Sequence, residues 1–519
     1  MDNYFVSSCK RVKDWICRQF GQKEKKTVHH KKFADGGEVI VWETGRAGEE
    51  AASYENLFLR KEIAGFRTNI RREQSCSIKS LTRDYLYKQL LSSGEYTFDH
   101  MLVIKDPYGE APLTALALFI LEEPACVRVT TKGNLKETDF VTELPKKKEH
   151  RVPILGMYAE KANDIVIEIL DDEGNCVKSH TFTIRTKRLP KSLRNVITVK
   201  KWTDKPAYSN IMINGGVKIH TCVFDIEGKI RYYLSRKPRG YGIFPLSDGH
   251  FFYMEKYISV PSYSNPQTVE SYDMDYFGRV FRTYLTEKGV HHTAEEKAGG
   301  NILTGSNSML EHTEDCVIEI DRQTGEIVWQ LNMAEIFDET YQNMMDWCHV
   351  NSAAYYEKDR TILISLRNVH AVICVDYDTK KLRWILSDPK FWEGTKMTPY
   401  LLQPEGDVKW CYQQHAAFEI ALPDESNPQK KRIIVYDNHW AKRRKAKSFD
   451  KDPLSYVSFY DIDEEKKSVS LHKRFAGPKT RIRANGIYVP DKKRVYNMAG
   501  SYAEPVDGDG GGIFEYDYE

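Results

Sequence analysis

The sequence predicts a mainly β protein, in which a six-bladed β-propeller follows a small N-terminal β-sandwich. Three observations support this fold class. A turn-type aspartate before a β-rich run recurs six times in residues 191–519, at intervals of about 50 residues, the length of a four-stranded blade. Residues 98–190 alternate short β-rich runs with turn residues, as a sandwich does. The composition, with 31 tyrosines and 22 phenylalanines, favours strands.

Residues 1–97 form a third, N-terminal region, which is expected to be partly helical and partly mobile. Residues 1–35 are expected to be mobile, and residues 50–97 are rich in charged and helix-tolerant residues. No apolar run reaches the ~20 residues of a membrane-spanning helix. The first residues, "MDNYFVSSCKRVKDWICRQFGQ", lack the apolar core and cleavage site of a secretory signal. We therefore expect no membrane partner and a cytoplasmic location.

Charge and cysteine usage agree with that expectation. The chain has 76 basic and 74 acidic residues, so its net charge gives no reason to expect a nucleic-acid partner. Its ten cysteines show no CxxC spacing. Reduced structural thiols are therefore favoured over a disulfide framework.

Different sequence features predict the sandwich and the propeller. In residues 98–190 the strand-like runs are "HMLVIKDPY", "LTALALFIL", "CVRVTT" and "DIVIEILDDEGNCVKSHTFTIRT". In residues 191–519 the repeated turn aspartates are Asp225, Asp275, Asp321, Asp376, Asp461 and Asp517. The widest gap contains the basic run "NHWAKRRKAKSFDKDPLS", which is expected to be a long loop.

The last blade needs a strand from elsewhere, because the chain ends two residues after Asp517. The run "RNVITVKKW" at 194–202, just before the first blade, can supply its outer strand. Such closure would remove an exposed sheet edge and hold the ring shut.

Three histidines lie at about the same phase of successive repeats, measured back from the turn aspartates. They are His292, His349 and His415. The innermost strand opens each blade and lines the central channel, so residues in the same phase converge around the axis. These histidines are candidate catalytic residues.

Arg367 is the fourth candidate catalytic residue. It ends the run "TILISLR", and an antiparallel hairpin with "NSAAYY" would return it to the end where His349 lies. Asn351 would lie close by. The predicted substrate-binding residues are therefore His349, Arg367 and Asn351.

These side chains suit an oxyanion substrate. Arginine presents a planar fork that matches sulfate or phosphate oxygens, and a neutral imidazole can act as a nucleophile. Three imidazoles would also suit zinc, but the fixed charge of Arg367 disfavours a dication, so no metal is expected. The sequence has no P-loop or Rossmann glycine pattern, so neither a nucleotide sulfate donor nor another cofactor is expected.

Several stretches resemble the bacterial arylsulfate sulfotransferase family, the nucleotide-independent aryl sulfotransferases. They are "HVNS", "ISLRNVHAVI", "KLRWIL", "LLQPEG" and "QQHAAF", with "KDPYGEAPLTALAL" and "VPILGMYAEKANDIVIEI" similar to the N-terminal domain of that family. The resemblance implies a six-bladed propeller, a homodimer, and ping-pong transfer of a sulfuryl group from an aryl sulfate ester to a phenol.

The resemblance also implies residue roles. His415, in the "QH" motif, matches the transiently sulfated nucleophile, while His349, Arg367 and His292 match sulfate-binding or transition-state groups. Some exported relatives carry a short disulfide loop before the "QH" motif, where this chain has only Cys411.

Two other functions remain open at this stage. A propeller hydrolase would release sulfate to water from the same intermediate. A non-catalytic propeller would present one face to a protein partner, because fold alone does not settle function.

Overall fold

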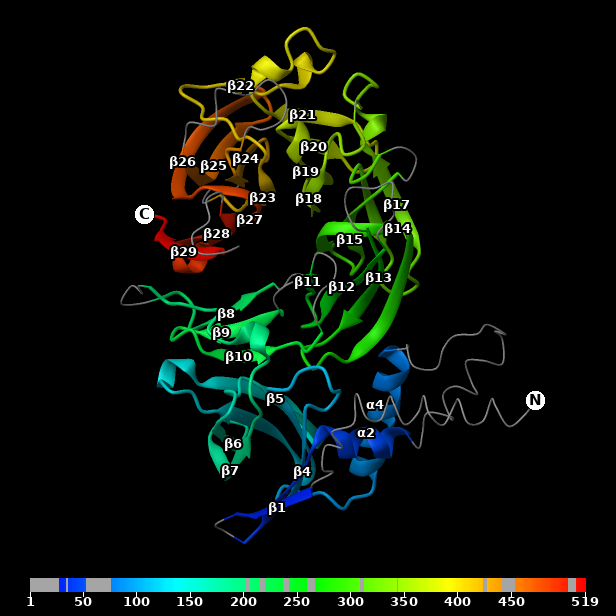
Figure 1. Cartoon of the computed structure of the whole chain (residues 1–519), viewed down its shortest axis with the longest axis vertical. Helices are drawn as coiled ribbons and strands as arrows, with labels where there is room; N and C mark the ends of the chain where they lie inside the picture. The colour runs from blue at the N-terminus through cyan, green and yellow to red at the C-terminus, as the bar shows by residue number, and fades with distance from the viewer. Residues whose placement is uncertain are drawn as a thin grey trace, which may run out of the picture.

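The computed structural model describes residues 28–33, 36–52, 76–200, 206–214, 220–236, 242–258, 267–308, 312–342, 344–422, 427–440, 453–502 and 510–519. The predicted fold class is confirmed: the chain is mainly β, with a sheet domain at one end and the propeller blades at the other (Figure 1). None of the described helices is long and apolar enough to cross a membrane.

The N-terminal domain is built on one seven-stranded sheet. Its strands are β1 (Val28–Lys32), β2 (Glu38–Trp42), β3 (His100–Lys105), β4 (Ala115–Thr131), β5 (Phe140–Ile154), β6 (Ala162–Leu170) and β7 (Cys176–Arg185). β1 and β2 come from the N-terminal region and extend the sheet, with β2 parallel to β3. The alternating apolar residues of these strands supply the core of the domain.

Two helices cover part of this sheet, α2 (Thr44–Ala52) and α4 (Cys76–Ser92). Leu86 and Tyr87 of α4 are buried with Leu102 and Leu118 of the sheet. α4 also contacts the propeller, because Asp84 accepts a 2.9 Å hydrogen bond from Arg279. The expectation that residues 1–35 are mobile falls almost wholly outside the described residues.

The propeller consists of six strand groups. The first three are β8 (Asn210–Ile213), β9 (Cys222–Asp225) and β10 (Ile230–Tyr233); β11 (Gly242–Pro245), β12 (Phe251–Ile258), β13 (Gln267–Met274) and β14 (Val280–Glu296); and the end of β14 with β15 (Ile302–Ser306), β16 (Cys316–Ile320) and β17 (Ile327–Asn332).

The last three groups complete the ring. They are β18 (Val350–Tyr356), β19 (Thr361–Leu366), β20 (Ala371–Asp376) and β21 (Leu382–Leu386); β23 (His415–Ile420), β24 (Lys430–Asp437), β25 (Leu454–Asp463) and β26 (Ser468–Pro478), with β22 (Gln403–Pro404) on the edge; and β27 (Thr480–Val489), β28 (Arg494–Tyr502) and β29 (Gly512–Asp517).

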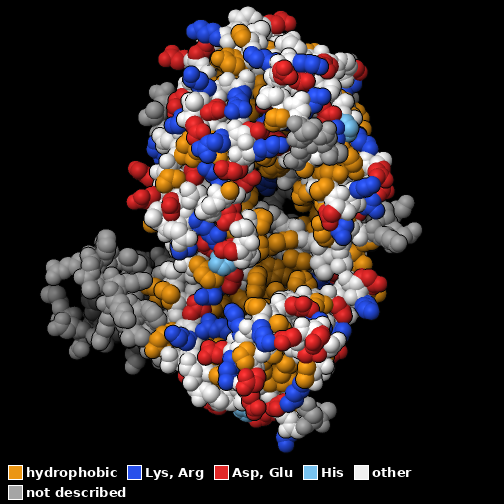
Figure 2. Space-filling model, turned by 180° about the vertical axis from the view of Figure 1, so that it is seen from behind, with side chains coloured by type: hydrophobic (Ala, Val, Ile, Leu, Met, Phe, Trp, Pro, Cys, Tyr) orange, Lys and Arg blue, Asp and Glu red, His pale blue; other side chains and the backbone are white. Residues whose placement is uncertain are grey.

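The inner strands contact one another in chain order. β14 contacts β18, β18 contacts β23, and β23 contacts β27. Apolar residues fill the space between neighbouring blades: Leu331 of β17, Trp347 and Ile364 of β19 belong to one buried cluster. Full burial of one such side chain contributes about 1.5–3 kcal/mol. In Figure 2 the molecular surface is hollowed near its middle, with hydrophobic side chains along the border.

The repeated aspartates cap turns in four of the six repeats. The carboxylate of Asp225, for example, accepts the backbone N–H groups of Glu227 and Lys229. The prediction was wrong for Asp461, which lies inside β25 and binds Arg432. Asp463 makes that turn instead, by accepting the N–H of Lys466, because β25 continues past Asp461 and ends at Asp463. Asp517 ends β29 and pairs with Arg494.

The predicted closing strand was wrong for residues 194–200, which form no strand. Methyl groups of Ile197 and Val199 lie beside Gly228 in the turn between β9 and β10, so they pack on the first blade. Residues 201–205 lie outside the described part of the chain, as do residues 441–452 of the expected long loop. The first and last blades instead meet where the Ala207 N–H donates to Glu515 (3.1 Å) and Tyr208 lies against Tyr496.

Buried Arg231 joins the N-terminal domain to the first blade. It lies on β10 and donates to the backbone oxygens of Gly156 (2.7 Å) and Thr138 (2.6 Å). Its guanidinium lies over the ring of Tyr158, 4.1 Å from the centroid, and 3.8 Å from Asp225. The positive charge of Arg231 is therefore stabilised by the carboxylate, the carbonyl groups and the aromatic ring that meet at this junction.

We predict that Arg231→Met destabilises the protein by about 3–5 kcal/mol, because it leaves a buried carboxylate and two carbonyl groups without their cationic partner. Urea unfolding measures this change. Exposed Arg360 provides the control, since surface substitutions change stability by about 0.5 kcal/mol or less. An Arg231→Met midpoint equal to that of Arg360→Met would contradict the assignment.

Candidate active site

The structure brings the three predicted histidines together with Arg367. His292 lies in β14, His349 directly precedes β18, and His415 is the first residue of β23. The rings of His292 and His349 are 4.8 Å apart, and both His349 and Arg367 lie close enough to His415 to influence its pKa. We refer to His292, His349, His415 and Arg367 as the histidine cluster.

The backbone at each histidine is locally unusual. The φ angles are +58° at His292 and +57° at His349, while around His415 they are +50° at Gln413 and +48° at Ala416. Left-handed φ at residues other than glycine costs of order 1–3 kcal/mol each, and such residues concentrate at functional sites. The surrounding blades stabilise left-handed residues at the histidine itself in two of the sites and on either side of it in the third.

A bulge accompanies each of these positions. The register of β14 with β15 shifts between His291 and Ala294, which leaves His292 and Thr293 unpaired in the ladder. Similar shifts skip Asn351 in β18 and Ala416 in β23. A bulge redirects side chains that strict alternation would place on one face or the other.

Arg367 lies where the sequence predicts. Val350 pairs with Leu366 across the β18–β19 hairpin, and the Arg367 N–H donates to the His349 carbonyl (3.1 Å). The guanidinium donates to Asn368 Oδ1 (3.3 Å) and Gln413 Oε1 (3.2 Å), so it reaches the segment that leads into His415. Asn351 links the same two elements, because its Nδ2 donates to the Gln414 carbonyl (2.8 Å).

Two carboxylates that the sequence reasoning missed bind His349. The Nδ1–H group of His349 faces Glu314 Oε2 at 2.6 Å and Asp346 Oδ2 at 2.9 Å. Burial alone would lower the pKa of His349, but Glu314 and Asp346 raise it to about 9. His349 is therefore an imidazolium at neutral pH. Asp346 lies three residues before His349, so the sequence could have indicated this contact. Glu314 comes from another blade, and its contact with His349 could not be predicted from the spacing.

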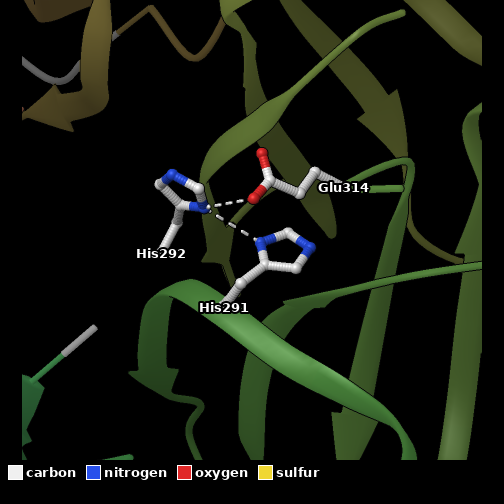
Figure 3. A group of neighbouring side chains, drawn as sticks. All are labelled: His291, His292 and Glu314. Atoms are coloured by element: carbon white, nitrogen blue, oxygen red, sulfur yellow. Dashed lines mark hydrogen bonds and ion pairs between the residues drawn. The ribbon is translucent and has the colours of Figure 1, made fainter. Parts of the chain in front are cut away.

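His292, in contrast, is neutral. His291 Nε2 lies 2.8 Å from the Ser306 carbonyl, which can only accept, so neutral His291 has its lone pair on Nδ1. That lone pair and Glu314 Oε1 face His292 Nδ1 at 3.2 and 3.7 Å (Figure 3). Both need a donor, so the single proton of His292 lies on Nδ1. Burial lowers the pKa of both histidines.

The same atoms offer ligands to a metal ion. Among the described residues, donor atoms of His291, His292 and Glu314 lie within 4.8 Å of one another, as do those of Glu314, Asp346 and His349. In both groups, hydrogen bonds and ion pairs already account for the close approach. The expectation that the site holds no metal stays a prediction.

His415 is also neutral. Burial and the nearby Arg367 lower its pKa to about 3, although the hydrogen bond to Asn438 opposes them. His415 Nδ1 lies 2.6 Å from Asn438 Oδ1, and the Arg483 N–H donates to Nε2 at 3.3 Å. The cluster therefore combines two cationic donors, His349 and Arg367, with two neutral imidazoles. Such a set can bind an anion and attack it.

We predict that Glu314→Gln lowers the pKa of His349 from about 9, because the variant loses the carboxylate that contributes most to raising it. NMR titration of the histidine rings measures the shift. Since the folded pKa exceeds the ordinary value of 6.5, protonation of His349 stabilises the protein fully below pH 6.5. That contribution disappears as the pH rises through 9. An unchanged His349 titration in Glu314→Gln would contradict the ion pair.

Comparison with known proteins places the chain in a family. A family model described as Arylsulfotransferase (ASST) matches residues 195–507, and one described as Arylsulfotransferase Ig-like domain matches residues 102–187. The proteins named arylsulfate sulfotransferase AssT from Lelliottia amnigena and Escherichia coli O6:H1 are 21% and 22% identical to it. Each alignment spans 493 residues and covers 71% of this chain and 78% of that protein.

Solved structures overlap the chain only loosely. The β-propeller domain of Cps50 (Swd1) from Myceliophteria thermophila is 12% identical, with 77% of this chain and 98% of that chain covered, at a TM-score of 0.31. An overlap this loose adds nothing to the assignment. The two family models, which together match most of the sheet domain and the propeller, do assign it: this chain belongs to the arylsulfotransferase family.

Proposed function

We propose that the protein moves a sulfuryl group from an aryl sulfate ester to a phenol, in two steps that share a sulfated His415. The observation that carries this proposal is the neutral, buried imidazole of His415 beside the cations of Arg367 and His349. Family membership supports the reaction class. No nucleotide donor is required, because the sequence lacks a phosphate-binding glycine loop.

In the first step, a lone pair of His415 forms a bond to sulfur while the bond from sulfur to the aryl oxygen breaks. The phenolate leaves with that electron pair and takes up a proton from the solvent. Arg367 and His349 donate hydrogen bonds to the sulfuryl oxygens. Fixed donors of this kind, directed at oxygens that gain charge in the transition state, are a large source of catalysis.

In the second step, the oxygen of the acceptor phenol attacks sulfur, and the electron pair of the sulfur–nitrogen bond returns to His415. The phenol gives up its proton, which balances the proton taken by the first phenolate. His292 is the group we assign to accept it, since its Nδ1 is already protonated and Nε2 carries its lone pair. Glu314, 3.7 Å from Nδ1, would stabilise the resulting imidazolium.

The expected homodimer and cytoplasmic location complete the proposal. The homodimer rests on the resemblance to the family, and the cytoplasmic location rests on the absence of paired cysteine motifs in the sequence. The seven cysteines that the structure describes as free form no disulfide with one another.

We predict that His415→Asn abolishes both steps, because the amide of asparagine is not a nucleophile and cannot form the bond to sulfur. The assay follows nitrophenol release from 4-nitrophenyl sulfate with and without a second phenol, and mass spectrometry locates an SO₃ group on the peptide with "QQHAAF". His472→Asn, a partly exposed histidine on β26, is the control and should retain full activity.

Other results of this assay would point elsewhere. Release that needs no acceptor would indicate a hydrolase, and no release at all would favour a binding module. Full activity in His415→Asn would remove the mechanism.

We predict that Arg367→Lys lowers the transfer rate by roughly 10²–10³-fold while the fold is retained, since lysine keeps the charge but loses the planar fork. Arg360→Lys is the matched control, because Arg360 lies on the same blade and forms its ion pair with Asp378 in an exposed position. Steady-state kinetics compare the two. Near-native turnover in Arg367→Lys would mean that the guanidinium is structural.

A further inference from the structure

We propose that Asn438 is a positioning residue, which holds the His415 ring with its proton on Nδ1 and its lone pair on Nε2. Nε2 is then the atom that attacks sulfur. The catalytic part of this inference rests on the proposed function, whereas the position of the proton does not. No feature of the sequence pattern singled out Asn438, which follows β24 directly.

The contact itself is short and buried. Asn438 is 0% exposed, and its Oδ1 lies 2.6 Å from His415 Nδ1. An asparagine amide offers an accepting oxygen and a donating nitrogen of nearly the same shape. The direction of this hydrogen bond must therefore be argued from the groups behind the amide.

Ser455 and Thr480 determine that direction. Ser455 Oγ donates its one proton to the backbone carbonyl of Asn438 (2.9 Å), which can only accept. The same Oγ accepts a hydrogen bond from the backbone N–H of Thr480 (2.9 Å). Towards Thr480 Oγ1, at 3.1 Å, Ser455 can therefore only accept. The proton of Thr480 is then used in the contact with Ser455, and the Tyr436 hydroxyl, 3.3 Å from Thr480 Oγ1, acts as a donor to it. Thr480 Oγ1 therefore accepts from Asn438 Nδ2 (2.9 Å).

The amide nitrogen of Asn438 consequently faces Thr480, and its oxygen faces His415. An oxygen acceptor requires a proton on His415 Nδ1. The opposite side of the ring leads to the same result, because the backbone N–H of Arg483 can only donate and lies 3.3 Å from Nε2. This second contact is long, so a sulfuryl group can replace it.

A neutral acceptor suits a nucleophile better than a carboxylate would in this place. Asparagine orients the ring without adding negative charge, so His415 stays neutral. An aspartate would keep the proton on Nδ1 but raise the pKa of His415. The ring would then become doubly protonated, and unable to attack, as the pH falls.

The position of the proton is tested on the full chain without substrate. In protein with ¹⁵N-labelled histidine, the two ring nitrogens of His415 give distinct shifts for N–H and for a lone pair, and comparison with His415→Gln assigns them. The expected result is a protonated Nδ1 and an unprotonated Nε2. A proton on Nε2 would overturn the proposal.

The catalytic role is tested by the rate at which His415 is sulfated in a single turnover with 4-nitrophenyl sulfate. Asn438→Leu should slow this step by roughly 10²–10⁴-fold, because a catalytic histidine in the wrong tautomer loses a comparable factor. Asn438→Asp should restore most of the rate at alkaline pH and lose it as the pH falls. Asn301→Leu, which removes an asparagine bound to Glu319 outside the cluster, is the control.

The possible outcomes are distinct. A native rate in Asn438→Leu, or no acid loss in Asn438→Asp, would overturn the positioning role. If Asn438→Leu does not fold, Thr480→Val and Thr480→Ser replace it, and only the variant without a hydroxyl should slow sulfation. If the unmodified protein is never sulfated, the proposed function fails, while the NMR result still decides the tautomer.

Discussion

The ion pair between buried Glu314 and His349 is the interaction on which the electrostatics of the histidine cluster depend. An unpaired carboxylate at a position with no exposed side-chain surface would cost several kcal/mol, and the imidazolium of His349, 2.6 Å away, compensates it. The other oxygen of Glu314 faces His292, whose proton it helps to hold on Nδ1. Glu314 thus favours the cationic form of His349 and helps to orient His292 as a neutral base. His415, whose pKa is lowered by burial and by Arg367, stays a neutral nucleophile.

This division of charge depends on backbone geometry that local propensity disfavours. Regular strand alternation would direct His291 and His292 to opposite faces, yet His291 Nδ1 and Glu314 Oε1 both face His292 Nδ1. The left-handed φ of His292 and the bulge beside it bring the two rings together. Buried apolar contacts between the blades compensate the free-energy cost of this strained backbone. The residues that stabilise the fold are therefore different from those that form the histidine cluster.

The sequence predicted the parts of the fold that repeat. Periodic turn aspartates indicated six blades, and their phase selected His292, His349 and His415, all of which meet in the structure. The errors occurred where one repeat departs from the others: β25 is longer than its counterparts, so Asp463 rather than Asp461 makes the turn. Ile197 and Val199 are β-branched, as expected for a closing strand, but they pack on the first blade. Propensity cannot show which neighbour a strand-forming run will meet.

The sequence by itself determined the fold class, the order of the two domains and the identity of the histidines and arginine in the cluster, because all of these follow from periodicity and from short motifs. Only the tertiary structure decided which groups bind them. Glu314 lies in a different blade from His349, and among 74 acidic residues nothing in the sequence pattern marks it. The protonation of each ring depends on groups a few ångströms away in space, some of which, such as Glu314 and Asn438, lie far away in sequence. Hydrogen bonds and ion pairs act over such distances, so the chemistry of the site emerges only when the blades are packed together.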